Sequence, residues 1–378
     1  MALVLNEEQV MLRDSAAGFL GGKASVAQLR ALRDGDEELR FDAQVWSEMV
    51  EMGWAAIAIP EGYGGLGYGY TGLGVVLEQM GRHLSAAPLQ SAVLLGATLL
   101  EALGSEAQKS EWLAAIAAGE RRVSLALQEG AQFAPRRVAL RAEPDGDGFV
   151  LNGEKSLVAD ALGADAFVVI GRSGDAAGAD GISAFLVPAD AAGLTVTPCD
   201  LVDARQYGAL QLQDVRVDGA QLLGAVGKAW PALERALDIG AVGIAAELLG
   251  LSLEAFERTM DYIRERKQFG VPIGSFQGLQ HRAATLFTEL ELARSIVLKA
   301  LHAVDEGSEE LPLLASAAKA KLSAVAVLAT NEGVQMHGGV GMTDEYDIGL
   351  YMKRARVLRH MLGDENYHLD RFARLEGF

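Results

Sequence analysis

A short turn between two long amphipathic segments gathers the residues best suited to chemistry. Arg266, Gln268 and Gln277 lie in or beside it, and Pro272 and Gly274 interrupt the helical pattern. A guanidinium can bind a phosphate, and amides can hydrogen-bond a heterocycle. The same residues also fit a solvated corner between two helices, which is the simpler interpretation from spacing alone.

Long helices must position this turn. Apolar residues recur at helical spacing over residues 239–263 before it and over 279–300 after it. Long segments rich in Ala, Leu and Glu, joined by short connections, predict a C-terminal four-helix bundle. The expected helices are 230–263, 279–304, 311–332 and 348–362.

The first 120 residues also read as helical. Asn6 is placed as an N-cap before Glu7, and apolar residues follow at spacings of three and four. The glycine-rich stretch 62–74 predicts a loop. Further helices are expected near residues 42–52, 72–81 and 105–118.

From Arg122 the pattern changes to short alternating runs separated by Gly, Asp and Pro, which favours an antiparallel β domain, either a barrel or a sandwich. The chain is therefore expected to be an α+β multidomain protein with domains at 1–120, 121–225 and 226–378. The expected strands are 123–127, 138–142, 149–152, 166–171, 182–188, 194–198 and 209–217.

The charge excludes several classes of partner. With 33 basic and 51 acidic residues, the formal net charge is −18, which disfavours nucleic acid and anionic membrane surfaces. Cys199 is the only cysteine, so no disulfide can form within the chain, and the scattered histidines argue against a metal site. No signal peptide and no uninterrupted membrane-spanning stretch is recognised, so a cytoplasmic location is expected.

The segment Arg266 to Gln280 resembles the R-x-Q-F-G-x-P-I-x-x-F-Q-x-x-Q signature of the acyl-CoA dehydrogenase family. Three further motifs follow the family in order along nearly the whole chain. The first motif is residues 58–67 together with Glu78 and Gly81-Arg82, and the second is Gly153-Glu154-Lys155. The third motif, Gln335 to Met342, is similar to the family's Q-x-H-G-G-x-G.

The resemblance implies that FAD binds between the β domain and the bundle, with its adenine end reaching a neighbouring subunit. A base then removes the α-proton of an acyl thioester while the flavin accepts the β-hydride. The cofactor residues carried over are Arg266 for the pyrophosphate, Gln268 and Phe269 for the adenosine pocket, Phe276 and Gln277 beside them, and Gln335, Gly338 and Gly339 for the phosphates. A helix C-cap with a tight turn would explain the two glycines equally well.

The flavin-contacting motifs are poorly matched. The family's T-E-P-x-A-G-S-D corresponds to Gln128-Glu129-Gly130 and then 132–135, where only the glutamate is retained. The family's K-x-W-I-T-N corresponds to residues 155–160. Leu157 cannot stack as an indole does, and Ala159 has no hydroxyl to donate.

The catalytic base is missing at both family positions, because these are Leu362 and Gly240, and Ala241 replaces the usual arginine. Asp364 and Glu365 are the acidic residues nearby. A displacement of two or three positions moves a helical side chain to another face, so a solvated acidic turn is the preferred interpretation of both.

These departures, with Gly363-Asp364 and then His368-Leu369, resemble the small subunit of two-component acyl-CoA dehydrogenases of the pimeloyl-CoA dehydrogenase type. The leading hypothesis is a subunit that works with a second acyl-CoA dehydrogenase-like chain in a tetramer. It would act on an acyl-CoA and pass electrons to an electron-transfer flavoprotein or a similar acceptor, in fatty acid or steroid side-chain degradation. The alternatives are a self-sufficient homo-oligomer using Asp364 as base, and a scaffold without FAD.

Overall fold

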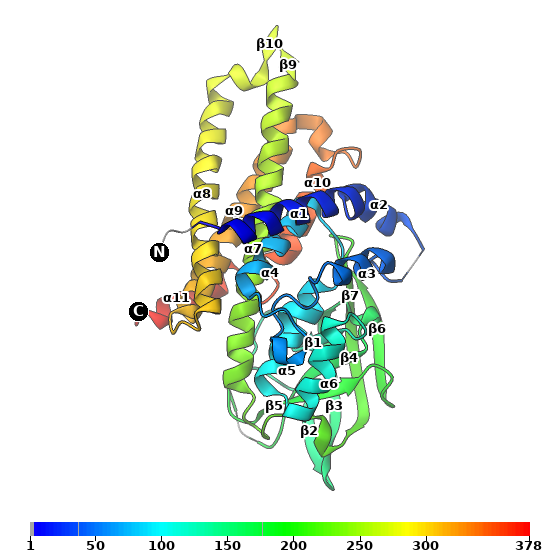
Figure 1. Cartoon of the computed structure of the whole chain (residues 1–378). Helices are drawn as coiled ribbons and strands as arrows, with labels where there is room; N and C mark the ends of the chain where they lie inside the picture. Colours follow the sequence, from blue (N-terminus) through cyan, green and yellow to red (C-terminus); the bar gives the residue numbers. More distant parts are fainter. Residues whose placement is uncertain (1–3, 37, 176) are drawn as a thin grey trace. The chain divides into compact units, whose positions relative to one another are not determined.

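A computed structural model describes residues 4–36, 38–175 and 177–378 (Figure 1). They form two compact units. The helical unit comprises Met1–Asp34, Tyr70–Ala86 and Ala241–Phe378, and the β unit comprises Gly35–Gly69 and Ala87–Gly240. The helices of the first 120 residues are therefore divided between the two units.

The helical unit is built around long helices that the hydrophobic periodicity predicts well (Figure 1). The Asn6 N-cap is confirmed, since its side chain accepts a hydrogen bond of 2.8 Å from the Gln9 N–H. The helices are α1 (Glu7–Lys23), α2 (Val26–Asp34), α4 (Tyr70–His83), the part of α7 (Trp230–Glu265) from Ala241, α8 (Gln277–Asp305), α9 (Leu311–His337), α10 (Ile348–Leu358) and α11 (Glu365–Leu375).

Two predicted boundaries in this unit are wrong. The expected helix 348–362 ends at Leu358, because Leu362 and Gly363 have positive φ angles of 53° and 102°, and α11 follows as an additional helix. The loop expected over residues 62–74 ends before Tyr70, because α4 already begins there. Asp305 accepts hydrogen bonds from the first N–H groups of this helix.

Glycines allow α4 and α7 to pack with their backbones in contact. A Cβ at Gly81 would lie 2.1 Å from the Glu247 carbonyl oxygen, and one at Gly250 would lie 1.8 Å from the Glu78 carbonyl oxygen. Since real Cβ atoms do not approach that closely, only glycine fits at these two positions.

The β unit holds one sheet with the strand order β6-β7-β3-β2-β4-β5-β8, and β1 pairs with β4. Most strand pairs are antiparallel, as predicted. Two are parallel: β1 pairs with β4, and β2 pairs with β4 at the single position Arg141–Arg172. Phe149, Phe185 and Leu210 are part of its core. The strands are β1 (Val123–Ala126), β2 (Arg141–Asp145), β3 (Gly148–Ala159), β4 (Ala166–Arg172), β5 (Ile182–Pro188), β6 (Leu194–Asp200), β7 (Gln206–Val217) and β8 (Leu222–Leu223).

The remaining elements of this unit precede or connect the strands. The expected strand 138–142 begins only at Arg141, because the N–H groups of Ala139 and Leu140 donate to the Glu129 carboxylate instead of to a neighbouring strand. The elements are α3 (Ala43–Glu51), η1 (Glu61–Tyr63), the π-helix η2 (Leu89–Ala97), α5 (Thr98–Leu103), α6 (Glu106–Ala117), η3 (Ala161–Gly163) and η4 (Gly219–Gln221).

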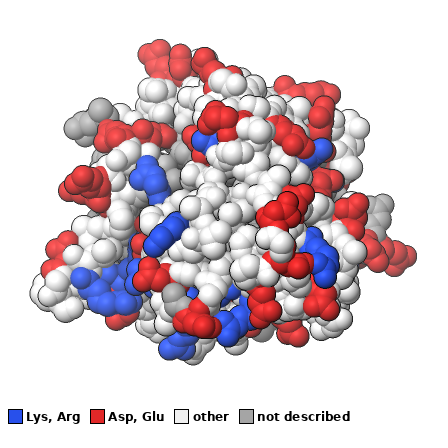
Figure 2. All heavy atoms as spheres, turned by 90° about the horizontal axis from the view of Figure 1, so that it is seen from below, with Lys and Arg blue, Asp and Glu red and all other residues white. Residues whose placement is uncertain are grey.

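Two described helices, α7 and α9, are long and apolar enough to cross a membrane by length and composition alone. The most apolar window of α7 is wholly buried and that of α9 is mostly buried, as in the core helices of globular proteins. Figure 2 shows carboxylates spread over one face of the molecule among fewer basic groups, as the net charge of −18 requires.

Candidate functional site

The predicted polar turn is a β-hairpin at the junction of α7 and α8 (Figure 1). Strands β9 (Lys267–Gln268) and β10 (Val271–Pro272) pair antiparallel, and the 3-10 turn η5 (Ile273–Ser275) leads into α8. The hairpin is closed by the Ile273 N–H, which donates to the Arg266 carbonyl oxygen at 2.8 Å, and Gln280 donates to the Gly274 carbonyl oxygen at 3.0 Å. Sequence therefore located the turn, and structure shows it to be ordered by its own backbone.

The polar and aromatic side chains of the hairpin are exposed. Phe269 is 92% exposed with φ of 55°, and its ring meets Phe276 edge to face at 6.1 Å. Arg266, Gln268 and Gln277 are exposed, and the Arg266 guanidinium forms no ion pair with any residue that the structure describes. A bare aromatic ring beside an unpaired guanidinium suits a heterocycle joined to a phosphate.

The second glycine-containing motif lies at the C-terminal end of α9, where η6 (Gly338–Met342) begins. Gly338 has φ of 65° and its N–H donates to the Gln335 carbonyl oxygen, as the helix-cap interpretation requires. A Cβ built at Gly338 or Gly339 would meet no atom within 4 Å, and Gln335 is exposed. The cap is thus also open to a ligand, and the two interpretations are compatible.

Aromatic stacking joins the two motifs. The His337 ring stacks on Tyr262 at 4.3 Å and lies 5.0 Å from Tyr346. Tyr262 stands one helical turn before Arg266, whose N–H donates to the Tyr262 carbonyl oxygen at 2.8 Å. The structure therefore brings the ends of α7 and α9 together, and sequence reasoning missed both tyrosines. The only sequence signal for this contact was an aromatic residue, Tyr262, one helical turn before Arg266.

In the β unit, the retained glutamate and lysine form an ion pair in which the lysine is buried and the glutamate is partly buried. Lys155 Nζ donates to Glu129 Oε1 at 2.5 Å, and the same carboxylate accepts the Ala139 N–H at 2.6 Å and the Leu140 N–H at 3.0 Å. Burial lowers the pKa of Lys155 to about 8, although Glu129 opposes that shift. This pair fixes the loop after β1 to strand β3, so its retention has a structural reason.

The end of β3 lacks the aromatic ring and the hydroxyl that the family resemblance predicts beside the flavin. Leu157 is 40% exposed with φ of 52°, so an aliphatic side chain stands where the family has an indole. Asp160 follows with φ of 52°, and the Ser91 hydroxyl donates to its carboxylate at 2.6 Å. These contacts shape the turn without supplying a stacking ring or the threonine hydroxyl absent at Ala159.

The turn around Leu362 is held from inside. The buried Lys319 Nζ donates to the carbonyl oxygens of Gly363 at 2.7 Å and Arg359 at 3.0 Å, and the His368 ring lies 2.9 Å from the Leu362 carbonyl oxygen. Burial lowers the pKa of Lys319 to about 7 and that of His368 to about 3. These basic groups are occupied by the backbone of the turn.

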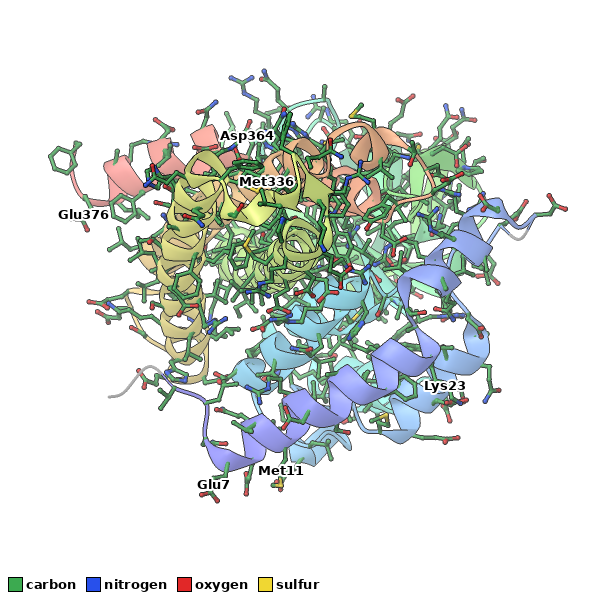
Figure 3. All side chains as sticks on the ribbon, turned by 90° about the horizontal axis from the view of Figure 1, so that it is seen from above. Glu7, Met11, Lys23, Met336, Asp364 and Glu376 are labelled. Atoms are coloured by element: carbon green, nitrogen blue, oxygen red, sulfur yellow. The ribbon has the colours of Figure 1, made fainter. Side chains whose placement is uncertain are left out.

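Asp364, the candidate base, is the N-cap of α11, and Figure 3 shows it at the start of that helix. Its carboxylate accepts the Tyr367 N–H at 2.9 Å, which explains the residue without catalysis. Gly240 and Ala241 lie buried inside α7 and carry no proton acceptor. The catalytic role of Asp364 therefore stays a prediction. Among the described residues, no cluster of His, Cys, Asp or Glu suits a metal ion.

Comparison with known proteins agrees with this arrangement. The family descriptions "Acyl-CoA dehydrogenase, N-terminal domain", "middle domain" and "C-terminal domain" match residues 6–120, 128–215 and 227–375. The Bacillus subtilis (strain 168) protein "Probable acyl-CoA dehydrogenase YngJ" is 35% identical over 367 residues, which cover 95% of each chain.

Two solved structures are similar over nearly their full length. The Tcur3481-Tcur3483 steroid ACAD has a TM-score of 0.88, 30% identity and 98% coverage of each chain. The ChsE4-ChsE5 complex from Mycobacterium tuberculosis has a TM-score of 0.90, 26% identity and 100% coverage of each chain. With three family domains matched in order, this chain belongs to the acyl-CoA dehydrogenase family of FAD-dependent oxidoreductases.

Proposed function

We propose that this chain is one subunit of a two-chain enzyme that oxidises the Cα–Cβ bond of an acyl-CoA thioester. The observation that carries the proposal is the contrast between complete, exposed adenosine-end motifs and absent base and flavin contacts. Leu362, Gly240 and Leu157 occupy the positions where the family has a base or a stacking ring. The likeness to the Tcur3481-Tcur3483 and ChsE4-ChsE5 proteins, each named as a pair, supports a partner chain.

The residues of the helical unit fit the adenosine end of FAD. Arg266 would hold the pyrophosphate, Phe269 would lie against the adenine, and the open backbone at Gly338 would approach a phosphate. When bound, FAD accepts the hydride that leaves the substrate. The α-proton would go to a carboxylate of the partner subunit, since the side chains of this chain at both family positions cannot accept one.

The proposal is tested by expressing the chain alone and together with any dehydrogenase-like chain that co-purifies from the native cell. The expected result is a colourless, inactive single chain and a yellow complex that oxidises acyl-CoA. Visible absorbance and acyl-CoA turnover are the measurements. A single chain with full flavin content and ordinary turnover would overturn the proposal.

The two alternatives predict other outcomes of the same experiment. If the chain is a self-sufficient homo-oligomer, Asp364→Asn must abolish turnover while flavin absorbance remains. If it is a scaffold, the preparation stays colourless even with the partner and added FAD. The acyl group, the electron-transfer flavoprotein as acceptor and the cytoplasmic location stay predictions.

A further inference from the structure

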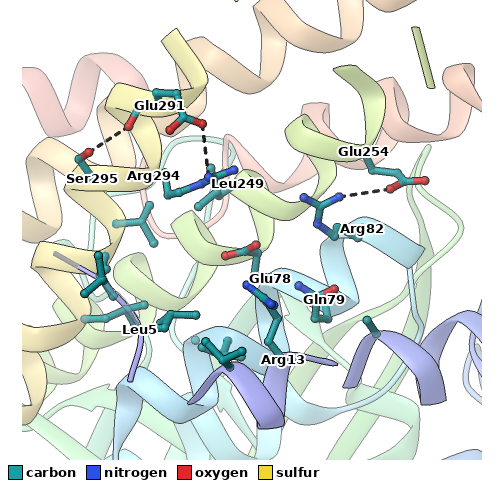
Figure 4. Close-up of a pocket in the computed structure, with 18 of the residues that line it drawn as sticks. Leu5, Arg13, Glu78, Gln79, Arg82, Leu249, Glu254, Glu291, Arg294 and Ser295 are labelled. Carbon is teal, nitrogen blue, oxygen red and sulfur yellow. Dashed lines mark hydrogen bonds and ion pairs between the residues drawn. The ribbon is translucent and has the colours of Figure 1, made fainter. Parts of the chain in front are cut away.

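The helical unit contains a half-open cavity of about 850 Å³ lined by residues of α1, α4, α7 and α8 (Figure 4). The hairpin at Arg266 and the turn at Leu362 do not line it. Its volume falls within the range of roughly 300–1,000 Å³ that small-molecule sites occupy. The cavity can therefore hold a small molecule without involving the candidate cofactor residues.

Aliphatic side chains from all four helices line part of the cavity. They are Val10 of α1, Val75 of α4, Leu249 of α7, and Leu298 and Leu301 of α8. A hydrocarbon body that lies against such a surface leaves water, which favours binding in proportion to the apolar area that is covered. The lining therefore suits a ligand with an aliphatic body.

The cavity also contains charged side chains, and its arginines are already paired. Figure 4 shows Glu78 of α4 with Arg13 of α1, Arg82 of α4 and Arg294 of α8 around it. Each guanidinium has a carboxylate partner: Asp14 for Arg13 at 2.8 Å, Glu257 for Arg82 at 2.8 Å, and Glu291 for Arg294 at 3.3 Å. These three ion pairs leave Glu78 as a further negative charge.

Glu78 is the carboxylate of this cavity that lacks a counter-charge. It is half-buried, and it forms no hydrogen bond or ion pair with a residue in the described part of the chain. Reduced contact with water raises the pKa of Glu78, although the charges of Arg82, Arg294 and Arg13 oppose the rise. Burial lowers the pKa of the neighbouring His83, which favours the neutral imidazole and supplies no cation.

The unpaired carboxylate decides the charge of the ligand head. An anionic head would be repelled by Glu78, and a neutral head would leave the carboxylate without a counter-charge. A protonated amine supplies that charge and donates charge-assisted hydrogen bonds to the carboxylate oxygens. Because the cavity is half-open, the ammonium keeps part of its hydration, so the cost of removing it from water is smaller than in a closed core.

We propose that this cavity binds an amphipathic organic amine, a small molecule with one protonated nitrogen and an aliphatic body. The ammonium donates to the Glu78 carboxylate. The aliphatic body lies against Val10, Leu298 and Leu301. The site goes beyond the acyl-CoA reaction and depends neither on FAD nor on a partner chain.

The test compares three probes of equal chain length with different heads, namely octylamine, 1-octanol and octanoate, each below its aggregation limit. Binding to the full-length chain is measured by calorimetry at pH 8, where an alkylamine stays protonated because its pKa, like that of lysine, is about 10.4. Octylamine is expected to bind about tenfold more tightly than 1-octanol, which corresponds to about 1.4 kcal/mol, and octanoate is expected to bind most weakly. Equal or tighter binding of 1-octanol or octanoate would overturn the assignment of the head.

Glu78→Gln separates this site from general attraction of a cation to a chain with a net charge of −18. The change keeps the shape of the side chain and is expected to reduce octylamine affinity to that of 1-octanol, while 1-octanol binding stays the same. Glu120→Gln is the matched control, because it removes the same charge at an exposed position outside the cavity. An equal loss in both variants, or no loss in Glu78→Gln, would contradict the proposed contact.

Two further variants test whether the aliphatic body lies in this cavity. Leu298→Trp fills it, and Ser295→Phe obstructs it should the tryptophan variant fail to fold. Both are expected to abolish octylamine binding, whereas the matched Leu292→Trp, at a 54% exposed position of α8 outside the cavity, leaves it unchanged. Octylamine binding that persists in both blocking variants, or is absent from the parent chain, overturns the proposal.

Discussion

The hairpin at Arg266 and the turn at Leu362 are both irregular, polar segments of the helical unit, but their side chains face opposite ways. The hairpin exposes Phe269 and Arg266, and its internal hydrogen bonds come mainly from the backbone. The turn is held from inside by Lys319 and His368. The difference teaches that the side chains of the hairpin are free to contact a ligand, whereas Lys319 and His368 are already engaged by the backbone of the turn.

Like the groups that hold the turn at Leu362, the Glu129–Lys155 pair holds the fold from inside. Breaking this pair should have the largest effect on stability at neutral pH. Lys155→Met leaves the partly buried Glu129 carboxylate without its cation, at a cost of up to about 3 kcal/mol in the free energy of unfolding. Urea unfolding measures the change, and Lys228→Met at an exposed position serves as control. A loss no larger than that of the control would mean that the pair does not fix the loop.

His368 should make the stability of the turn depend on pH. Its pKa is about 3 in the folded chain and near 6.5 when unfolded, so the unfolded state binds the extra proton between these values. Stability is therefore expected to fall as pH drops from 6.5 towards 3, by on the order of 4 kcal/mol.

The change His368→Gln should flatten that part of the pH profile of unfolding, because the amide keeps a donor for the Leu362 carbonyl oxygen without gaining charge. The exposed His281→Gln is the matched control and should leave the profile unchanged. An equal acid sensitivity in the His368 variant and the parent would remove His368 as the cause.

Arg266→Ala tests whether the exposed side chains of the hairpin bind FAD. FAD retention by the assembled complex is expected to weaken roughly tenfold or more, since a charge-assisted contact to a phosphate is lost, while unfolding of this chain is unchanged. Arg264→Ala, which removes another exposed guanidinium, one that is paired with Asp261, is the control. Flavin release on dilution, followed by absorbance, makes the comparison. Equal retention by both variants would break the proposed role.

Phe269→Gly should have the smallest effect on the stability of the chain. Unlike the other changes, it should stabilise the fold slightly. The ring is almost fully exposed and the residue has φ of 55°, so glycine relieves strain of about 1 kcal/mol and slightly raises the Tm. Flavin retention by the complex should nevertheless fall. A variant that loses stability as well would show that the Phe269–Phe276 contact supports the hairpin itself.

Much of the fold follows from local pattern. The helical periodicity predicts α7, α8 and the start of α9 closely, and the alternating runs predict β4 and β5. The misses have long-range causes. The strand expected at 138 begins later because Glu129, distant in sequence, takes its N–H groups, and β1 lies parallel to β4 because strand pairing is a tertiary choice.

By itself, the sequence determined the family, because the family motifs depend only on residue type and order. The missing base at Leu362 and Gly240 and the residues for the adenosine end of FAD are predictions that follow from that resemblance. Only the tertiary structure decided that Arg266 and Phe269 point outward, that Asp364 caps α11, and that Tyr262 and His337 join the two motifs. The reason is physical, since exposure and pairing depend on neighbours that are far apart in the chain.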